Sequence, residues 1–338
     1  MVKATATLRI NNDIRRRIAE GLLLGHTAAD VVRRLVADGI GEQDAEQEVA
    51  NAARSPYIAA ARRLQNRVAK RDWLLDTQRR LNRLRDPLVP RSYRLAPDEF
   101  RNAYYLAGRP VIVTGMMDAC TAVSKWEPSY FRQAFRDRVI DAQSGTMSES
   151  PHLLLRAERK RSIKFAKFLD SMAPTEAGAY LSMTAKNSPR NRQSVPEIWR
   201  DIPPLPEYLA EGGAGHAALC FEPSGGITPF QHDIRNTLLA QVAGRRRVLL
   251  IPACEVGRVY NHTEAFSEVD GRNIDFGRYP DMRDVQVLSC TLSPGEMLLV
   301  PVGTFYFIEA LDVSIGLSFT NFRWPNAYDT GYPSRREF

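Results

Sequence analysis

The feature that most constrains the fold is a succession of short apolar segments, bounded by glycine and proline, that begins after Pro87. Several of these segments are apolar at consecutive positions, as expected for β-strands that are covered on both faces. Helical stretches lie between them at 96–108 and 162–173. The pattern predicts a mainly β sandwich or barrel with helical decoration. We expect strands at 109–115, 179–183, 216–223, 236–244, 246–252, 285–292, 296–303 and 312–322.

The residues before Pro87 have a different, helical pattern. Thr27 is a good N-cap for a helix that ends at Gly39, and the acidic start of 42–54 suits a second helix. Pro56 can open a long helix that ends before Pro87. We therefore predict two domains, a helical module at 1–88 and a β domain at 89–338. The module could cover a sheet, form a homodimer or hold a partner, and its sequence does not choose among these.

The positive charge of the chain is concentrated in one segment. The formal net charge is +7, and between Arg62 and Arg94 eleven basic residues face only Asp72, Asp76 and Asp86. Such a run is either a solvated helix face or a surface for an anionic partner such as an acidic peptide. No helix-turn-helix, zinc-finger or RNA-binding signature accompanies it, which disfavours nucleic acid.

The sequence also predicts a cytoplasmic protein without a membrane partner. It has no run of about 18 apolar residues, and its first residues lack the apolar stretch of a secretory signal. Its four cysteines, Cys120, Cys220, Cys254 and Cys290, are widely spaced and form no CxxC pair. They are typical of buried thiols in a reducing compartment rather than of a disulfide framework.

Three segments carry a resemblance to a known family. They are RPVIVTG (109–115), GGITPFQHDIRNTLLAQVAGRRRVLLIPA (225–253) and SPGEMLLVPVGTFYFIEALDVSIGLSFTNFRW (293–324). From Pro90 to Pro325 the chain resembles the cupin-like JmjC family of Fe(II)/2-oxoglutarate-dependent oxygenases. The resemblance implies a double-stranded β-helix, the jelly roll. Jelly rolls carry out many functions, so the function depends on which residues form the site.

The resemblance also implies where an iron site would lie. Such oxygenases hold Fe(II) with two histidines and one carboxylate. The family's first ligand position falls on Gln231, its acid on Asp233 and its distal histidine on Tyr306, so only Asp233 is retained. An amide and a phenol are poor substitutes for imidazoles. His232 is adjacent to Asp233 and would face the other side of a regular strand, unless a bulge turned it inward.

The co-substrate positions are altered less. Arg246 matches the lysine that grips the distal carboxylate of 2-oxoglutarate in the family, and a guanidinium suits a carboxylate. Thr228 matches a threonine that can hydrogen-bond the same group. Thr237 and Ser318 stand where the family commonly has asparagine. The alternative is that Arg246 is simply one of three surface arginines, Arg245, Arg246 and Arg247.

These residues leave several functions open. One is a protein that binds a peptide or protein substrate without iron or 2-oxoglutarate. It would use Asp233, Tyr306 and His232 for metal-free acid–base chemistry such as epimerisation, or serve only as a binding subunit. We expect the substrate to be acidic if the basic helices hold it. The alternative is an active Fe(II)/2-oxoglutarate-dependent hydroxylase that uses Gln231, Asp233 and Tyr306 as an unusual ligand set.

Overall fold

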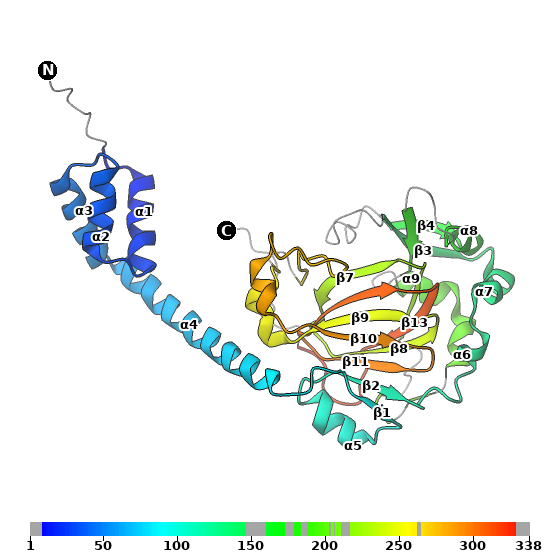
Figure 1. The fold of residues 1–338 in the computed structure, drawn as a ribbon. Helices are drawn as coiled ribbons and strands as arrows, with labels where there is room; N and C mark the ends of the chain where they lie inside the picture. The colour runs from blue at the N-terminus through cyan, green and yellow to red at the C-terminus, as the bar shows by residue number, and fades with distance from the viewer. Residues whose placement is uncertain are drawn as a thin grey trace. The chain divides into compact units, whose positions relative to one another are not determined.

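The computed structural model describes residues 9–146, 160–172, 179–183, 188–202, 204–205, 207–210, 217–261 and 265–328. The chain divides into two compact units, residues 1–78 and 79–338. Figure 1 shows the helices of the first unit and the strands of the second. The boundary falls inside a long helix, whose last residues belong to the second unit. Within that unit, Asn82 contacts Cys254 and Arg83 contacts Asp284.

The first unit is a small helical bundle built from α1 (Asn12–Leu23), α2 (Ala28–Ala37) and α3 (Glu42–Arg54). As predicted, Thr27 caps α2, accepting a hydrogen bond from the backbone N–H of Asp30. Apolar side chains at helical spacing point inward and form a separate core. This core contains Ile14, Ile18, Leu22, Val31, Leu35, Ile40, Ala45 and Val49.

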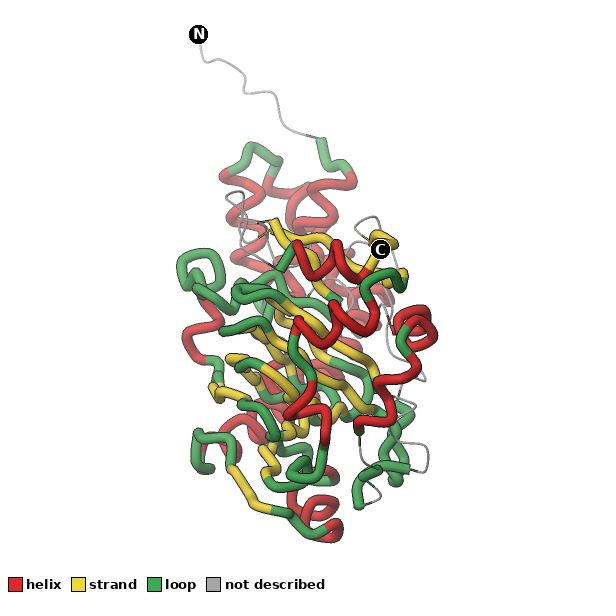
Figure 2. Tube along the Cα trace, turned by 90° about the vertical axis from the view of Figure 1, so that its right-hand side faces the viewer, coloured by secondary structure: helices red, strands yellow, loops and turns green. Residues whose placement is uncertain are grey.

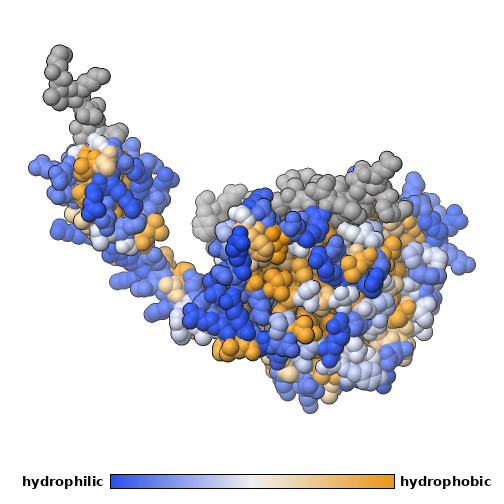
Figure 3. Space-filling model, in the orientation of Figure 1, coloured by the Kyte–Doolittle hydropathy of each residue, from blue (hydrophilic) through white to orange (hydrophobic). Residues whose placement is uncertain are grey.

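The long helix α4 (Pro56–Arg83) follows, and Ile58 is its only buried residue in the described chain. Most of its arginines are exposed, and so are apolar side chains such as Tyr57, Leu64 and Trp73. Figure 3 shows mostly hydrophilic side chains on the visible face of this helix, with apolar ones interspersed.

The second unit contains two main sheets. The six-stranded sheet has the order β1-β2-β11-β8-β13-β6, and the four-stranded sheet has the order β10-β9-β12-β7. The first sheet consists of β1 (Arg91–Tyr93), β2 (Val111–Thr114), β11 (Met297–Val300), β8 (Thr237–Ala243), β13 (Ser314–Phe319) and β6 (Ala218–Glu222). The second consists of β10 (Leu288–Leu292), β9 (Arg246–Ile251), β12 (Phe305–Ala310) and β7 (Ile227–His232).

Smaller elements complete the second unit. A three-stranded sheet, β4-β3-β5, contains β3 (Val139–Thr146), β4 (Lys160–Lys164) and β5 (Ala179–Ser182). The helices are α5 (Pro97–Glu99), the π-helix Phe100–Tyr105, α6 (Thr121–Lys125), α7 (Pro128–Phe135), α8 (Phe165–Asp170) and α9 (Ser188–Ser194). The described residues also form 3₁₀-helices at Pro196–Asp201, Ala253–Arg258 and Pro280–Asp284.

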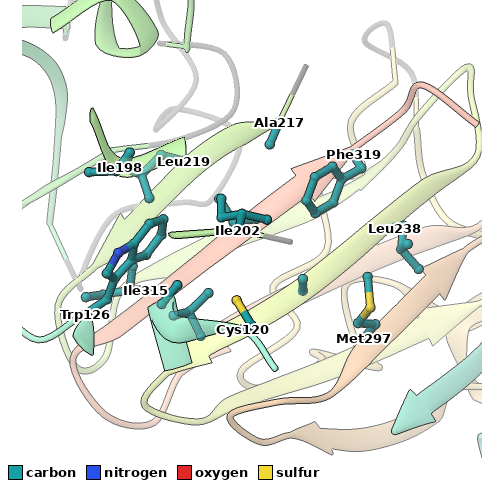
Figure 4. Packing of buried hydrophobic residues seen from close by; sticks show 14 of the residues in the cluster. Cys120, Trp126, Ile198, Ile202, Ala217, Leu219, Leu238, Met297, Ile315 and Phe319 are labelled. Atoms are coloured by element: carbon teal, nitrogen blue, oxygen red, sulfur yellow. The ribbon is translucent and has the colours of Figure 1, made fainter. Parts of the chain in front are cut away.

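Strand alternation distributes the apolar residues among three layers. Leu238, Met297, Ile315 and Phe319 point from the six-stranded sheet into a core that contains Trp126 and Ile198 (Figure 4). Their sequence neighbours, such as Leu239 and Leu298, form an inner core with Leu250 and Tyr306 of the other sheet. Phe305 and Phe307 belong to a third cluster, on the outer side of the four-stranded sheet. Figure 2 shows helices lying over the strands.

This arrangement confirms the predicted jelly roll with helical decoration. One local prediction is wrong, because 162–164 are not helical. Ile163 pairs with Ile140 in the ladder between β4 and β3, and α8 begins only at Phe165. In the described part of the chain, no helix is both long enough and apolar enough to cross a bilayer. The four cysteines are free.

Candidate functional site

A β-bulge in β7 brings Thr228 and Gln231 to the same face of the strand. Along β12, Tyr306 and Ile308 are two residues apart, but their partners on β7, Gln231 and Thr228, are three apart. In a regular strand, residues three apart point to opposite faces. The extra residue therefore lets both side chains point into the barrel, beside Tyr306 and Ile308 of the inner core.

The three positions that the resemblance assigns to iron ligands lie together and are hydrogen-bonded to one another. Gln231 Nε2 donates to the Tyr306 hydroxyl oxygen over 2.9 Å, and that hydroxyl donates to Asp233 Oδ2 over 3.0 Å. Thr237, one of the altered asparagine positions, also donates to Asp233 Oδ2 over 3.1 Å. Gln231 and Tyr306 are buried, and Asp233 is half-buried. We call these four residues the Asp233 cluster.

Tyr306 stays protonated in this cluster. Burial raises the pKa of its phenol well above the ordinary value near 10, and the nearby Asp233 carboxylate raises it further. The hydroxyl is therefore a hydrogen-bond donor to Asp233 at neutral pH and not a phenolate. No hydrogen bond is made by Asp233 Oδ1 within the described residues. The cluster thus holds one oriented carboxylate with an oxygen left for another donor.

The structure does not bring the His232 ring to the Asp233 cluster. His232 is buried and pairs with Phe305 across the ladder, and its ring packs edge-on against Phe305 at 4.8 Å between centroids. Phe305 belongs to the outer cluster, so His232 lies on the face opposite to Gln231. The bulge is N-terminal to Gln231 and leaves the alternation of Gln231, His232 and Asp233 intact.

The two positions assigned to the co-substrate lie together around a carboxylate that the sequence did not single out. Arg246 Nε is 3.2 Å from Glu222 Oε2, and Thr228 donates to Glu222 Oε1 over 3.3 Å. The side chains of Arg246 and Glu222 are only 4% and 5% exposed. We call these residues the Glu222 cluster. A charged residue at the end of an otherwise apolar strand, as in ALCFE, is the signal that could have revealed it.

Arg246 is therefore an interior residue and not a surface arginine. Gly316 of β13 makes room for its guanidinium, since a Cβ at Gly316 would lie 2.6 Å from Arg246 Nη1. Ser318, the other altered asparagine position, is half-buried on the same strand and two residues from Gly316. Alternation therefore places Ser318 on the inner face as well.

A small cavity of about 60 Å³ lies in the second unit, and no residue of the Asp233 cluster lines it. It is lined by Thr304, two residues before Tyr306, and by Leu250, the partner of Tyr306 on β9. Leu288 adds apolar surface. Arg85, Asp86 and Arg109 bring charges of both signs to the lining. The cavity can accept a small polar or apolar group.

The iron and 2-oxoglutarate that the fold implies can be tested against these residues. Non-haem iron needs imidazole and carboxylate donors, whereas here a neutral phenol, an amide and one carboxylate are hydrogen-bonded to one another. Among the residues that the structure describes, no three His, Cys, Asp or Glu side chains group to hold a metal ion. At the co-substrate positions, Arg246 already faces the carboxylate of Glu222. The residues do not fit either group.

Fold and site together define a jelly-roll protein of the oxygenase type. Residues 97–327 match the family model described as "Cupin-like domain". The chain belongs to the cupin-like JmjC family.

Curated relatives are similar over the same region. "Lysine-specific demethylase JMJ30" of Arabidopsis thaliana is 28% identical over 232 residues, which cover 67% of this chain and 52% of the relative. "Lysine-specific demethylase 8" of Xenopus tropicalis is 24% identical, covering 68% and 52%. "tRNA wybutosine-synthesizing protein 5" of Gallus gallus is 25% identical, covering 68% and 76%. The matched part spans about half the length of the two demethylases.

Proposed function

We propose that this chain binds a peptide or protein segment at the end of its barrel and transfers protons on it without iron or 2-oxoglutarate. Asp233 is the proton acceptor in this proposal. The observation that carries it is the set of hydrogen bonds in the Asp233 cluster. Tyr306 and Thr237 donate to the carboxylate, and Gln231 donates to Tyr306.

The reaction class that suits this cluster is removal and return of a proton at a peptide α-carbon, as in epimerisation. Asp233 Oδ1 accepts the proton, and the C–H electron pair stays on the substrate as an enolate. A solvent water molecule then donates a proton to the opposite face, and the hydroxide formed takes the proton from Asp233. This sequence is redox-neutral and needs no oxidant. Tyr306 and Thr237 act as positioning residues, because both donate to Oδ2 and fix the direction of the free oxygen.

The cavity favours a peptide over a nucleic acid. Arg85 and Arg109 supply positive charge, but Asp86 and the apolar Leu250 and Leu288 line the same cavity. A phosphate backbone is best met by a uniformly basic surface. The relatives have names that refer to lysine or to tRNA, so a polymeric substrate of either kind has a precedent in those names. Exposed arginines on α4 can add affinity for an acidic segment.

Two further properties belong to the same proposal. We place the protein in the cytoplasm, because its four cysteines are free thiols and two of them are buried. We also propose that the helical unit forms a homodimer contact through exposed apolar residues of α4, such as Leu64 and Val68.

The test is deuterium incorporation into acidic peptides of varied sequence, with the full-length protein in D₂O and EDTA. We expect a mass gain of about 1 Da at one residue, and we expect Asp233→Asn to abolish the gain. Glu309→Gln is the matched control, since Glu309 lies on the outer face of β12. Succinate release that depends on added iron would show a hydroxylase instead, and tight binding without turnover would show a binding subunit. Either result contradicts the acid–base proposal.

A further inference from the structure

We propose that Glu222 is a built-in occupant of the subsite that the fold provides for the distal carboxylate of 2-oxoglutarate. Arg246 and Thr228 would then hold a carboxylate of their own chain in place of the co-substrate. This inference rests on the proposed function and deepens it, because it explains how the barrel excludes the usual co-substrate.

Three strands from both sheets converge on this carboxylate. Glu222 ends β6, Arg246 begins β9 and Thr228 lies in the bulged part of β7. The contacts use both carboxylate oxygens, Oε2 toward Arg246 and Oε1 toward Thr228. Gly316 on the neighbouring strand β13 leaves the space that the guanidinium fills. The subsite is therefore built for a carboxylate and already contains one.

Charge makes a second carboxylate unfavourable here. The Arg246 guanidinium balances one negative charge, and the pair is almost completely buried, at 4% and 5% exposure. A dicarboxylate entering beside Glu222 would place two like charges a few ångströms apart in a region of low dielectric constant. Arg246 Nε and Nη2 and Glu222 Oε2 make no hydrogen bond within the described residues. Those groups can still form a hydrogen bond with a neutral partner such as water. The positive charge of Arg246, however, is already balanced by the negative charge of Glu222.

The test measures binding of 2-oxoglutarate in the presence of EDTA, by thermal unfolding and by isothermal titration calorimetry. For the wild type we expect no shift of Tm and no heat at 10 mM ligand. For Glu222→Ala, which empties the subsite and leaves Arg246 unpaired, we expect 2-oxoglutarate to raise Tm by at least about 3 °C. Glutarate, which keeps the distal carboxylate and lacks the keto group, should raise the Tm of Glu222→Ala in the same way.

Two variants serve as controls. Glu309→Ala removes a carboxylate that pairs with Arg247 on the outer face, and it should gain no response. Glu222→Ala/Arg246→Met should lose the response, because the cation is gone. If Glu222→Ala does not fold, Glu222→Gln is compared with the wild type, and we expect at least tenfold tighter binding from removal of the charge alone.

Binding of 2-oxoglutarate by the wild type as tight as by the Glu222 variants would overturn the inference, and so would a Glu222 variant that gains no binding. Neither result would touch the proposed function, which fails if turnover requires iron or if the protein binds peptides without turnover. The two ideas can therefore fail separately.

Discussion

Three consecutive arginines contrast the interior of the barrel with its surface. Arg245 pairs with Asp312 at 2.8 Å, and both side chains are about half exposed, at 57% and 43%. Arg247 pairs with Glu309 at 2.7 Å, at 34% and 25% exposure. Arg246, between them, pairs with Glu222 at 3.2 Å and is almost fully buried with it. Each pair joins an arginine to a carboxylate, and the pairs differ mainly in the burial of their side chains.

This difference shows that burial decides how much stability is lost when one partner of an ion pair is removed. On the surface, water solvates each partner when the other is lost, and salt screens the attraction. Inside the barrel, losing one partner leaves a buried charge that is poorly solvated. The alternation of β9 alone determines which arginine faces which environment, since Arg246 points inward and Arg247 outward. We expect the effects of substitution to follow the order of burial.

The largest effect is expected at the buried pair. Arg246→Met leaves Glu222 buried without its cation and should reduce the free energy of unfolding by about 3–5 kcal/mol. The double variant Arg246→Met/Glu222→Leu should recover at least half of that loss, because it removes both charges. Urea denaturation of the wild type, both single variants and the double variant measures the coupling. A loss below about 1 kcal/mol for Arg246→Met would show that the pair is hydrated and that the contrast with Arg247 is false.

A smaller effect is expected when the space for Arg246 is filled and its charge is kept. In Gly316→Ala the added Cβ would lie 2.6 Å from Arg246 Nη1 and 3.1 Å from the Ala240 carbonyl oxygen. The backbone oxygen cannot yield easily, so the substitution should cost about 1–3 kcal/mol. Gly257→Ala is the control, because nothing lies within 4 Å of its Cβ position. Equal midpoints in urea for the two variants would contradict this packing.

Substitution of Tyr306 in the Asp233 cluster should change the free energy of unfolding by an amount that depends on pH. Tyr306→Phe removes the hydroxyl between Gln231 and Asp233 and should cost about 1–3 kcal/mol at pH 7. Folding raises the pKa of Tyr306, so above pH 10 the unfolded chain loses this proton while the folded chain keeps it. Wild-type stability should therefore fall above pH 10, and Tyr306→Phe should fall less steeply. Parallel slopes in denaturation from pH 8 to 11 would mean that Tyr306 is accessible to water.

The sequence predicted the class of fold and several strands because many strand signals are local. The segment 236–244 became β8 (Thr237–Ala243), and 246–252 became β9 (Arg246–Ile251). The convergence of Gln231 and Tyr306 is not local, since 75 residues separate them. It followed only from the family's spacing, and β7 and β12 were not among the strands expected from composition.

The Glu222 cluster could not be predicted in the same way. No motif includes Glu222, and its partners Arg246 and Thr228 lie on two other strands. The bulge that turns Thr228 inward also has no clear sequence signal, although Pro229 within it is a residue that tends to disrupt ladders. The resemblance therefore assigned the ligand positions, whereas the contacts of Arg246 and Thr228 with Glu222 emerged only from the packing of the strands.

The smallest changes in stability are expected at the two ion pairs outside the barrel, Arg247–Glu309 and Arg245–Asp312. Glu309→Ala should change the free energy of unfolding by about 0–1 kcal/mol, because Arg247 can turn toward water. Asp312→Ala should also change the free energy of unfolding by only about 0–1 kcal/mol, since both partners are largely solvated. Both effects should shrink further in 0.5 M NaCl, whereas the loss in Arg246→Met should persist, because salt does not enter the barrel. If salt weakens all three alike, the interior is wet, and burial does not separate these arginines.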